Sequence, residues 1–301
     1  MSFSISDAFS RIVLTGTCKN VFDYTANPLG SNVVTAAWSN GSTALKGYSV
    51  TGLTFTAPVV LSANYYDDYE FLGKNGIPDD ATTGYSEMSG YGKRYSGGCK
   101  GQLTGNWTAR LTSQLAGSTY SVMYYDDRYR VIQRKGNNSL NGMEAVYTSY
   151  NFEGSPVKEK RVHSVPGQDI ITEVRNHTYD LANRLLQTTY QLNDDAPVIL
   201  VDNVYDEIGR LKTEKRTGHS KLRTDYTYNL RSWTKGINGP LFHQTLTYQE
   251  SIDGTTPCYN GNISSMTWKS GGSAATNEMP FRDLFLQHHL KQFISERTNT
   301  G

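Results

Sequence analysis

A short motif of Tyr-Asp or Tyr-Asn recurs along the chain and constrains the fold more than any other feature. The copies begin at Tyr125-Asp126, Tyr150-Asn151, Tyr179-Asp180, Tyr205-Asp206 and Tyr228-Asn229. Successive tyrosines are 25, 29, 26 and 23 residues apart. A fixed period in this range indicates one small structural unit that is used several times and stacks on its neighbours, because a single unit cannot bury its apolar face alone.

The two best copies predict tight turns. They share the pattern Tyr-Asp-x-x-Gly/Asn-Arg-Leu, formed by Tyr205, Asp206, Gly209, Arg210 and Leu211 and by Tyr179, Asp180, Asn183, Arg184 and Leu185. A type I turn favours Asp at its first position and Gly at its fourth. Asp accepts hydrogen bonds from the backbone ahead of it, whereas Gly, and after it Asn, tolerates a positive φ. Replacing Gly209 with Val is therefore predicted to strain the turn.

The other three copies keep only part of this signal. The copy at Tyr150-Asn151 retains a glycine, Gly154, at the expected place. The copy at Tyr228-Asn229 has Ser232 there, and the copy at Tyr125-Asp126 has Tyr129. The copy at Tyr125 is the weakest match of the five.

Strand-like alternation flanks the turns. The set Leu222, Thr224, Tyr226 and Tyr228 shares one face, and the set Arg223, Asp225 and Thr227 shares the other. A period of two is typical of a half-buried strand, so each unit is interpreted as a β-hairpin. Because an isolated hairpin is marginal in water, we expect the hairpins to pair into one long, curved antiparallel sheet with open edges.

The motif resembles the YD repeat of bacterial Rhs proteins, of the related teneurins and of toxin-complex shells. The resemblance implies an all-β fold in which the hairpins form part of a barrel or cocoon. It divides the chain into an irregular β-rich region over 1–120, YD repeats over 121–268 and a divergent tail over 269–301. The tail carries Phe281, Leu284, Phe285 and His288 on one face and is expected to form a short helix.

Two features of the resembled family are not found in the sequence: an Asp-Pro self-cleavage motif and a distinct toxin module after the repeats. An interrupted reading frame near Ser270 or a truncated gene product would explain the change of character in the tail. Repeat motifs in a shifted downstream frame would support the first explanation.

Charge and segment patterns exclude several partners and locations. The 29 Lys and Arg residues balance 28 Asp and Glu residues, so binding to nucleic acid or an anionic membrane is not expected. We expect neither a secretion signal nor a membrane span, because the first residues lack an apolar leader pattern and no long apolar stretch occurs. Three distant cysteines, Cys18, Cys99 and Cys258, are expected to be free thiols.

No motif for catalysis, metal binding or a cofactor stands out. Single histidines are scattered at His163, His177, His219 and His243. Acidic doublets at 67–68, 79–80, 126–127 and 194–195 lie beside turn signals, so we interpret them as turn residues rather than calcium or catalytic carboxylates. The segment 90–95, Gly-Tyr-Gly-Lys-Arg-Tyr, lacks the third glycine of a dinucleotide fingerprint and is interpreted as a glycine-rich loop.

The sequence therefore predicts a structural protein that is not an enzyme and needs no cofactor. In full-length relatives such a segment would enclose or display a C-terminal effector at the cell surface or outside the cell, with the rest of the shell as its partner. Two alternatives remain open. The 21 tyrosines would suit a module that binds cell-surface glycans, and a hydrolase could reside in the first 120 residues.

Overall fold

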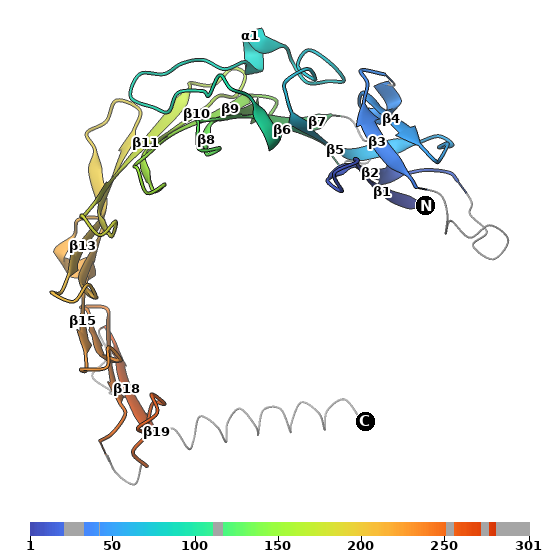
Figure 1. The fold of residues 1–301 in the computed structure, drawn as a ribbon. Coiled ribbons are helices and arrows are strands. Elements are labelled where there is room, and N and C mark those ends of the chain that lie inside the picture. Colours follow the sequence, from blue (N-terminus) through green and yellow to red (C-terminus); the bar gives the residue numbers. More distant parts are fainter. Residues whose placement is uncertain (21–32, 42, 111–116, 251–255, 272–276, 281–301) are drawn as a thin grey trace. The chain divides into compact units, whose positions relative to one another are not determined.

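The computed structural model describes residues 1–20, 33–41, 43–110, 117–250, 256–271 and 277–280, and these residues are almost entirely β (Figure 1). The strands are β1 Ser2–Ser6, β2 Ile12–Thr17, β3 Thr35–Trp38, β4 Tyr48–Thr51, β5 Val59–Asp67, β6 Cys99–Ala109, β7 Ser118–Tyr125, β8 Val131–Asn137, β9 Met143–Tyr150, β10 Pro156–His163, β11 Ile171–Tyr179, β12 Leu185–Leu192, β13 Val198–Tyr205, β14 Leu211–Arg216, β15 Arg223–Tyr228, β16 Thr234–Asn238, β17 Phe242–Thr247, β18 Ser265–Ser270 and β19 Asn277–Pro280. Helical structure in the described ranges is confined to α1 Asp80–Thr83, η1 Thr43–Leu45 and η2 Ser220–Leu222.

These elements confirm the predicted all-β class with antiparallel pairing. The predicted helix after residue 280 lies outside the described residues. Within the described part of the chain, no helix is both long enough and apolar enough to cross a membrane.

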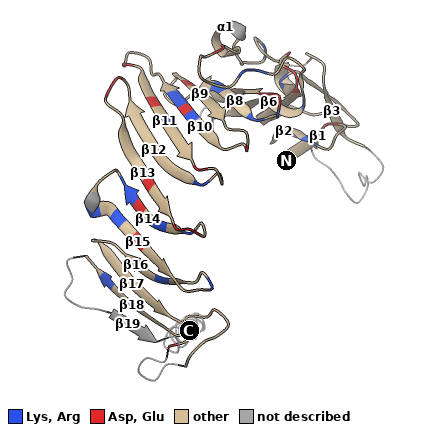
Figure 2. Ribbon diagram, turned by 60° about the vertical axis from the view of Figure 1, so that its left-hand side comes forward, with Lys and Arg blue, Asp and Glu red and all other residues tan. Residues whose placement is uncertain are grey.

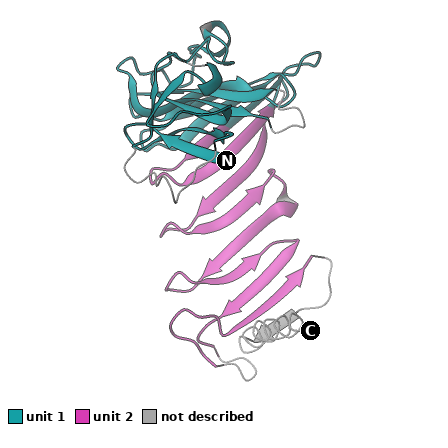
Figure 3. Ribbon diagram, turned by 90° about the vertical axis from the view of Figure 1, so that its right-hand side faces the viewer, with its two compact units in different colours: residues 1–175, 192–195 teal, residues 176–191, 196–301 magenta. Residues whose placement is uncertain are grey.

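The chain divides into two compact units (Figure 3). Unit 1 contains residues 1–175 and 192–195, and unit 2 contains residues 176–191 and 196–301. In unit 1 the strands pair antiparallel in the order β1, β2, β5, β6, β7, β8, β9 and β10. A separate hairpin, β3 with β4, contributes Ala36 and Tyr48 to a buried core that also contains Leu14, Val122 and Tyr124.

A long connection between β5 and β6, residues 68–98, covers one face of the sheet in unit 1. It carries α1 and lies over β8 and β9 (Figure 1). The buried side chain of Gln133 on β8 bonds to the backbone and hydroxyl of Ser86, and Lys135 Nζ donates to the carbonyl of Gly84 at 2.6 Å. These bonds fix the connection against the sheet.

Unit 2 is a succession of hairpins. Its strands β12 to β19 pair antiparallel in chain order, and Figure 3 shows them as a single layer. Most of their side chains are half-buried. Cross-strand pairs such as Thr213 with Asp225 and Lys215 with Asp202 therefore stabilise the sheet. Acidic and basic residues are interspersed along these strands (Figure 2).

Candidate functional site

The repeat motif forms a turn whose first residue accepts hydrogen bonds from the amides of the residues two, three and four positions ahead. In the best copy, the amide of Gly209 donates to the carbonyl of Asp206 at 2.9 Å, which closes the turn. One carboxylate oxygen of Asp206 accepts from the amides of Ile208 and Arg210 at 3.2 and 2.8 Å, and the other accepts from Arg210 Nε at 2.7 Å. The ladder shifts register just before the turn, between Val204 and Tyr205. This is a three-residue hairpin loop with a bulge.

The same geometry recurs at the other copies. The fourth turn residue has a positive φ in each, and these residues are Tyr129 at 59°, Gly154 at 98°, Asn183 at 57°, Gly209 at 90° and Ser232 at 63°. The first residue, Asp126, Asn151, Asp180, Asp206 or Asn229, accepts from an amide four positions on. Tyr129 and Ser232, which lack the glycine signal, thus occupy the same conformation as Gly209.

The arginine of each full motif contacts the tyrosine of a following hairpin. The guanidinium of Arg210 lies 4.7 Å from the ring centre of Tyr228, and its Nη1 donates to the carbonyl of Asn229 at 3.0 Å. The hydroxyl of Tyr228 donates back to the carbonyl of Leu211 at 2.8 Å. Two successive hairpins are therefore linked by a cation–π contact between Arg210 and Tyr228 and by hydrogen bonds from both side chains to backbone carbonyls.

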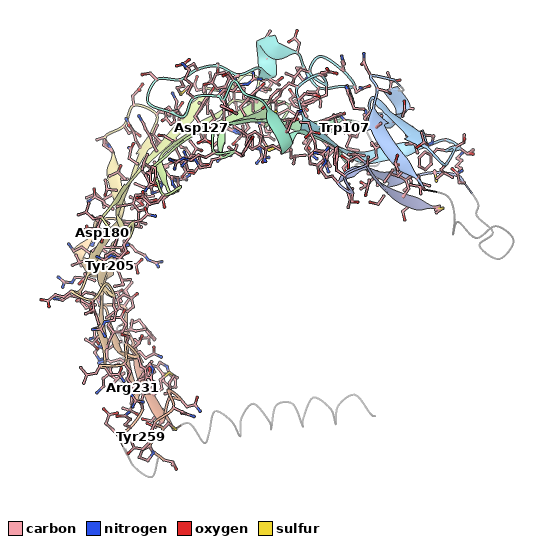
Figure 4. The ribbon with its side chains drawn as sticks, viewed as in Figure 1. Trp107, Asp127, Asp180, Tyr205, Arg231 and Tyr259 are labelled. Carbon is pink, nitrogen blue, oxygen red and sulfur yellow. The ribbon has the colours of Figure 1, made fainter. Side chains whose placement is uncertain are left out.

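The contact is repeated at two other arginines. Arg184 lies 4.7 Å from the ring of Tyr205, whose hydroxyl bonds the carbonyl of Leu185; Asp180 and Tyr205 are labelled in Figure 4. Arg130 lies 4.8 Å from the ring of Tyr150 in unit 1. Leu185 and Leu211 each begin the strand after their turn and contribute their carbonyls.

Two copies depart from this pattern. In the copy at Asn229, Trp233 replaces the arginine, and its ring centre lies 5.1 Å from that of Tyr248. The hydroxyl of Tyr248 donates to the carbonyl of Thr234 at 2.7 Å, so the link survives with a different side chain. In the copy at Asn151, Ser155 takes the arginine position and is too short to stack on a ring. The first tyrosine of the series, Tyr125, donates its hydroxyl to the carbonyl of Leu103.

Sequence reasoning missed a further copy near the N-terminus. Asp7 accepts from the amides of Phe9 and Arg11 and from Arg11 Nε, and Ser10 has a φ of 63°. The guanidinium of Arg11 lies 4.3 Å from the ring of Tyr66 and bonds both carboxylate oxygens of Asp67 at 2.9 and 2.7 Å. The signal that could have found it is Asp followed four residues later by Arg.

This Arg11 cluster makes stability sensitive to acid. The side-chain hydrogen bond from Arg11 lowers the pKa of Asp67. Burial alone would raise the pKa of Asp7, but bonds from Arg11 and the backbone outweigh it and lower the pKa. A carboxyl with a lowered folded pKa stabilises the fold above its unfolded pKa, and that contribution is lost as the pH falls through the folded value.

We therefore expect the free energy of unfolding to fall as the pH drops below about 4, the unfolded value for Asp. Arg11→Met should flatten this dependence, as measured by urea unfolding from neutral to acidic pH. The control is Arg134→Met, which removes an exposed arginine of β8. Equal acid sensitivity in wild type and Arg11→Met would contradict the role of the cluster.

The turn at Gly209 gives a second prediction. Gly209→Val should destabilise the protein by about 1–3 kcal/mol, because a β-branched residue is strained at a φ of 90°. Gly209→Asn should cost less than Gly209→Val, since Asn is the non-glycine residue best suited to a left-handed conformation, although either Cβ would lie 2.5 Å from Arg184 Nη1 and displace it. Thermal melting of both variants checks this, and an unchanged midpoint for the valine variant would rule out the strained turn.

Five of these six turns, all but the one at Asp126, also present an apolar side chain to solvent. The exposed residues are Phe9, Phe152, Leu181, Ile208 and Leu230, each one or two positions after the Asp or Asn. Leu181 and Leu230 are fully exposed. In unit 2, Arg231 beside the last of these turns donates to the carbonyl of Tyr259, and both are labelled in Figure 4.

The other ionisable residues considered in the sequence analysis are not grouped at one site. Nδ1 of His163 lies 2.6 Å from a carboxylate oxygen of Glu144, which also pairs with Arg161, and His177 contacts Thr188. Burial raises the pKa of the Cys99 thiol. Within the described ranges, no three His, Cys, Asp or Glu residues are grouped as a metal site would require.

No family model matches the chain, and no curated protein matches it. Among solved structures it is similar to a chain in the crystal structure of TcdB2-TccC3-Cdc42, with 9% sequence identity and a TM-score of 0.35. The alignment covers 93% of this chain and 16% of that chain. Similarity at this level assigns no family.

Proposed function

We propose that this chain is a structural segment of an Rhs-type shell and performs no chemistry itself. The observation that carries the proposal is the contact between the arginine of one hairpin and the tyrosine of the next, as in Arg210 with Tyr228. It is built from the repeat motif itself, so the motif couples neighbouring units. A wall of stacked repeats gains its stability from such neighbour contacts.

The chemistry of the motif favours a structural role over a catalytic one. Both carboxylate oxygens of Asp206 accept hydrogen bonds from its own turn, which leaves little capacity for a substrate. Burial raises the pKa of the motif residue Tyr125 to about 12, so its phenol is harder to ionise than that of an ordinary tyrosine. A protonated, bonded phenol is a poor general base.

The exposed apolar side chains at the turns support the proposal that further segments of the same shell pack against this chain. Leu181, Ile208 and Leu230 lie in alternate connections of unit 2, and in an antiparallel succession of strands alternate turns fall on the same edge. A row of exposed apolar side chains is typical of a surface that is covered in an assembly. Further walls of the same shell would cover it.

The test is to sequence the coding locus on both sides of this chain and translate all frames. We expect further Tyr-Asp-x-x-Gly-Arg turns at similar spacing, followed by a non-repetitive effector domain. Expression of the reconstructed full-length chain should then protect that effector from added protease, and Leu181→Asp with Leu230→Asp should reduce the protection. A locus with no further repeats in any frame would overturn the proposal.

A further inference from the structure

The connection between β5 and β6 differs from the short repeat turns. The loop between β7 and β8 spans only residues 126–130, whereas this connection spans residues 68–98. Long connections fixed on a rigid sheet often carry binding functions. With the ends of β6 and β7 it borders a half-open cavity of about 390 Å³ in unit 1, lined by Tyr69, Tyr85, Arg94, Tyr95, Ser96, Gly98, Cys99 and Tyr125.

The aromatic walls of the cavity are held in place. Tyr69 donates its hydroxyl to the carbonyl of Met123 at 2.8 Å, and the hydroxyl of Tyr85 accepts from the amide of Arg94 at 3.0 Å. The amide of Tyr95 donates to the carbonyl of Tyr125 at 2.9 Å, while its ring remains 40% exposed. The rings are therefore positioned before any ligand arrives, which lowers the entropic cost of binding.

Arg94 is the unusual residue of this cavity. Its guanidinium lies 4.6 Å from the ring centre of Tyr69 and 5.4 Å from that of Tyr124, so it is stacked like the arginines of the repeat motif. Those arginines, such as Arg130 and Arg210, each also pair with an aspartate. Arg94 has no carboxylate within ion-pair distance among the described residues.

We infer that this cavity binds a carboxylate-bearing sugar. Arg94 presents a planar fork of donors that matches a carboxylate, and its stacking on Tyr69 orients that fork. Tyrosine rings offer flat apolar faces for the C–H face of a sugar ring, and Ser96 supplies a hydroxyl for the sugar's polar edge. A cavity of about 390 Å³ lies within the size range of small-ligand sites. This function goes beyond the structural role proposed above.

The test compares an acidic and a neutral sugar that are otherwise alike. Titration calorimetry and ligand-observed NMR would use a disaccharide ending in glucuronic acid and its counterpart ending in glucose. We expect the acidic sugar to bind with a dissociation constant on the order of 0.1–1 mM and the neutral one at least about tenfold more weakly. Added salt should weaken the binding of the acidic sugar alone.

Three variants separate the roles of charge and ring. Arg94→Gln should weaken binding of the acidic sugar about tenfold and leave the neutral sugar unaffected. Tyr95→Ala should weaken both sugars, since this exposed ring contacts the sugar rather than the carboxylate. The matched control, Arg134→Gln on β8, should change neither, and thermal melting of each variant verifies the fold.

Several outcomes would overturn the inference. If the two sugars bound equally well, or if Arg94→Gln bound the acidic sugar as tightly as wild type, Arg94 would not recognise the carboxylate. If neither sugar bound at concentrations up to its solubility limit, the cavity would not be a sugar-binding site. Equally strong binding of inorganic phosphate would reduce the cavity to an unspecific anion site.

Discussion

Arg130→Ala is expected to lower the free energy of unfolding by about 2–4 kcal/mol. Arg130 Nε bonds Asp126 at 2.7 Å, its Nη1 bonds the carbonyl of Asn151 at 2.8 Å, and its guanidinium stacks on the ring of Tyr150. The side chain of Asp126 is only 9% exposed, so losing the arginine leaves a buried carboxylate without its charged partner. Urea unfolding followed by tyrosine and tryptophan fluorescence measures the change.

Two variants control for this prediction. Arg134→Ala removes an exposed arginine of β8 that lies four residues further along and should cost no more than about 0.5 kcal/mol. Arg130→Lys keeps the charge but loses the planar fork, so its cost should fall between those of the two alanine variants. If Arg130→Ala proved as mild as Arg134→Ala, the motif would not hold hairpins together and the proposed structural role would lose its main support.

The repeat turns were predictable because their chemistry is local. The turn depends on an Asp or Asn side chain that binds amides within four residues of itself, and such short-range patterns are visible in a sequence. The Asp or Asn at the first position determines the turn conformation more than the glycine at the fourth position does. Tyr129 adopts a φ of 59° and Ser232 a φ of 63°, because the bonds to Asp126 and Asn229 hold the turn in shape.

The Asp7 copy shows what this reasoning misses. It has neither the leading tyrosine nor the glycine, and only Asp7 and Arg11 remain of the motif. Its ring partner, Tyr66, comes from β5, which pairs with β2 across a long intervening segment. A contact between residues so distant in the chain depends on strand pairing, which local spacing does not specify.

The partners of the repeat tyrosines could not be foreseen from the sequence. Stacking on an arginine from the preceding turn needs the register of two strands, as the pairing of Tyr228 with Arg210 illustrates. The cavity around Arg94 was missed for a related reason. The sequence marked 90–95 only as a glycine-rich loop, whereas the cavity also requires Tyr69 and Tyr125 from elsewhere in the chain.

The second large effect is expected for Phe71→Ala, at about 3–5 kcal/mol of lost stability. Phe71 is 1% exposed, and its ring stacks on that of Tyr65 with centres 4.5 Å apart. It also occupies the space above Gly105, where an added Cβ would lie 2.3 Å from the Phe71 ring. Truncation would therefore leave a cavity between the long connection and the sheet. Urea unfolding against Phe9→Ala, whose ring is 76% exposed and should cost little, measures the difference.

Phe71→Ala also connects the core with the cavity. Phe71 lies two residues after Tyr69, and the centres of the two rings are 6.3 Å apart, so the core ring supports a wall of the cavity. We expect the variant to bind the acidic disaccharide more weakly even under conditions where it remains folded, because Tyr69 would no longer be held in place. A variant that lost stability but kept full sugar affinity would show that the connection positions Tyr69 and Arg94 without help from the core beneath them.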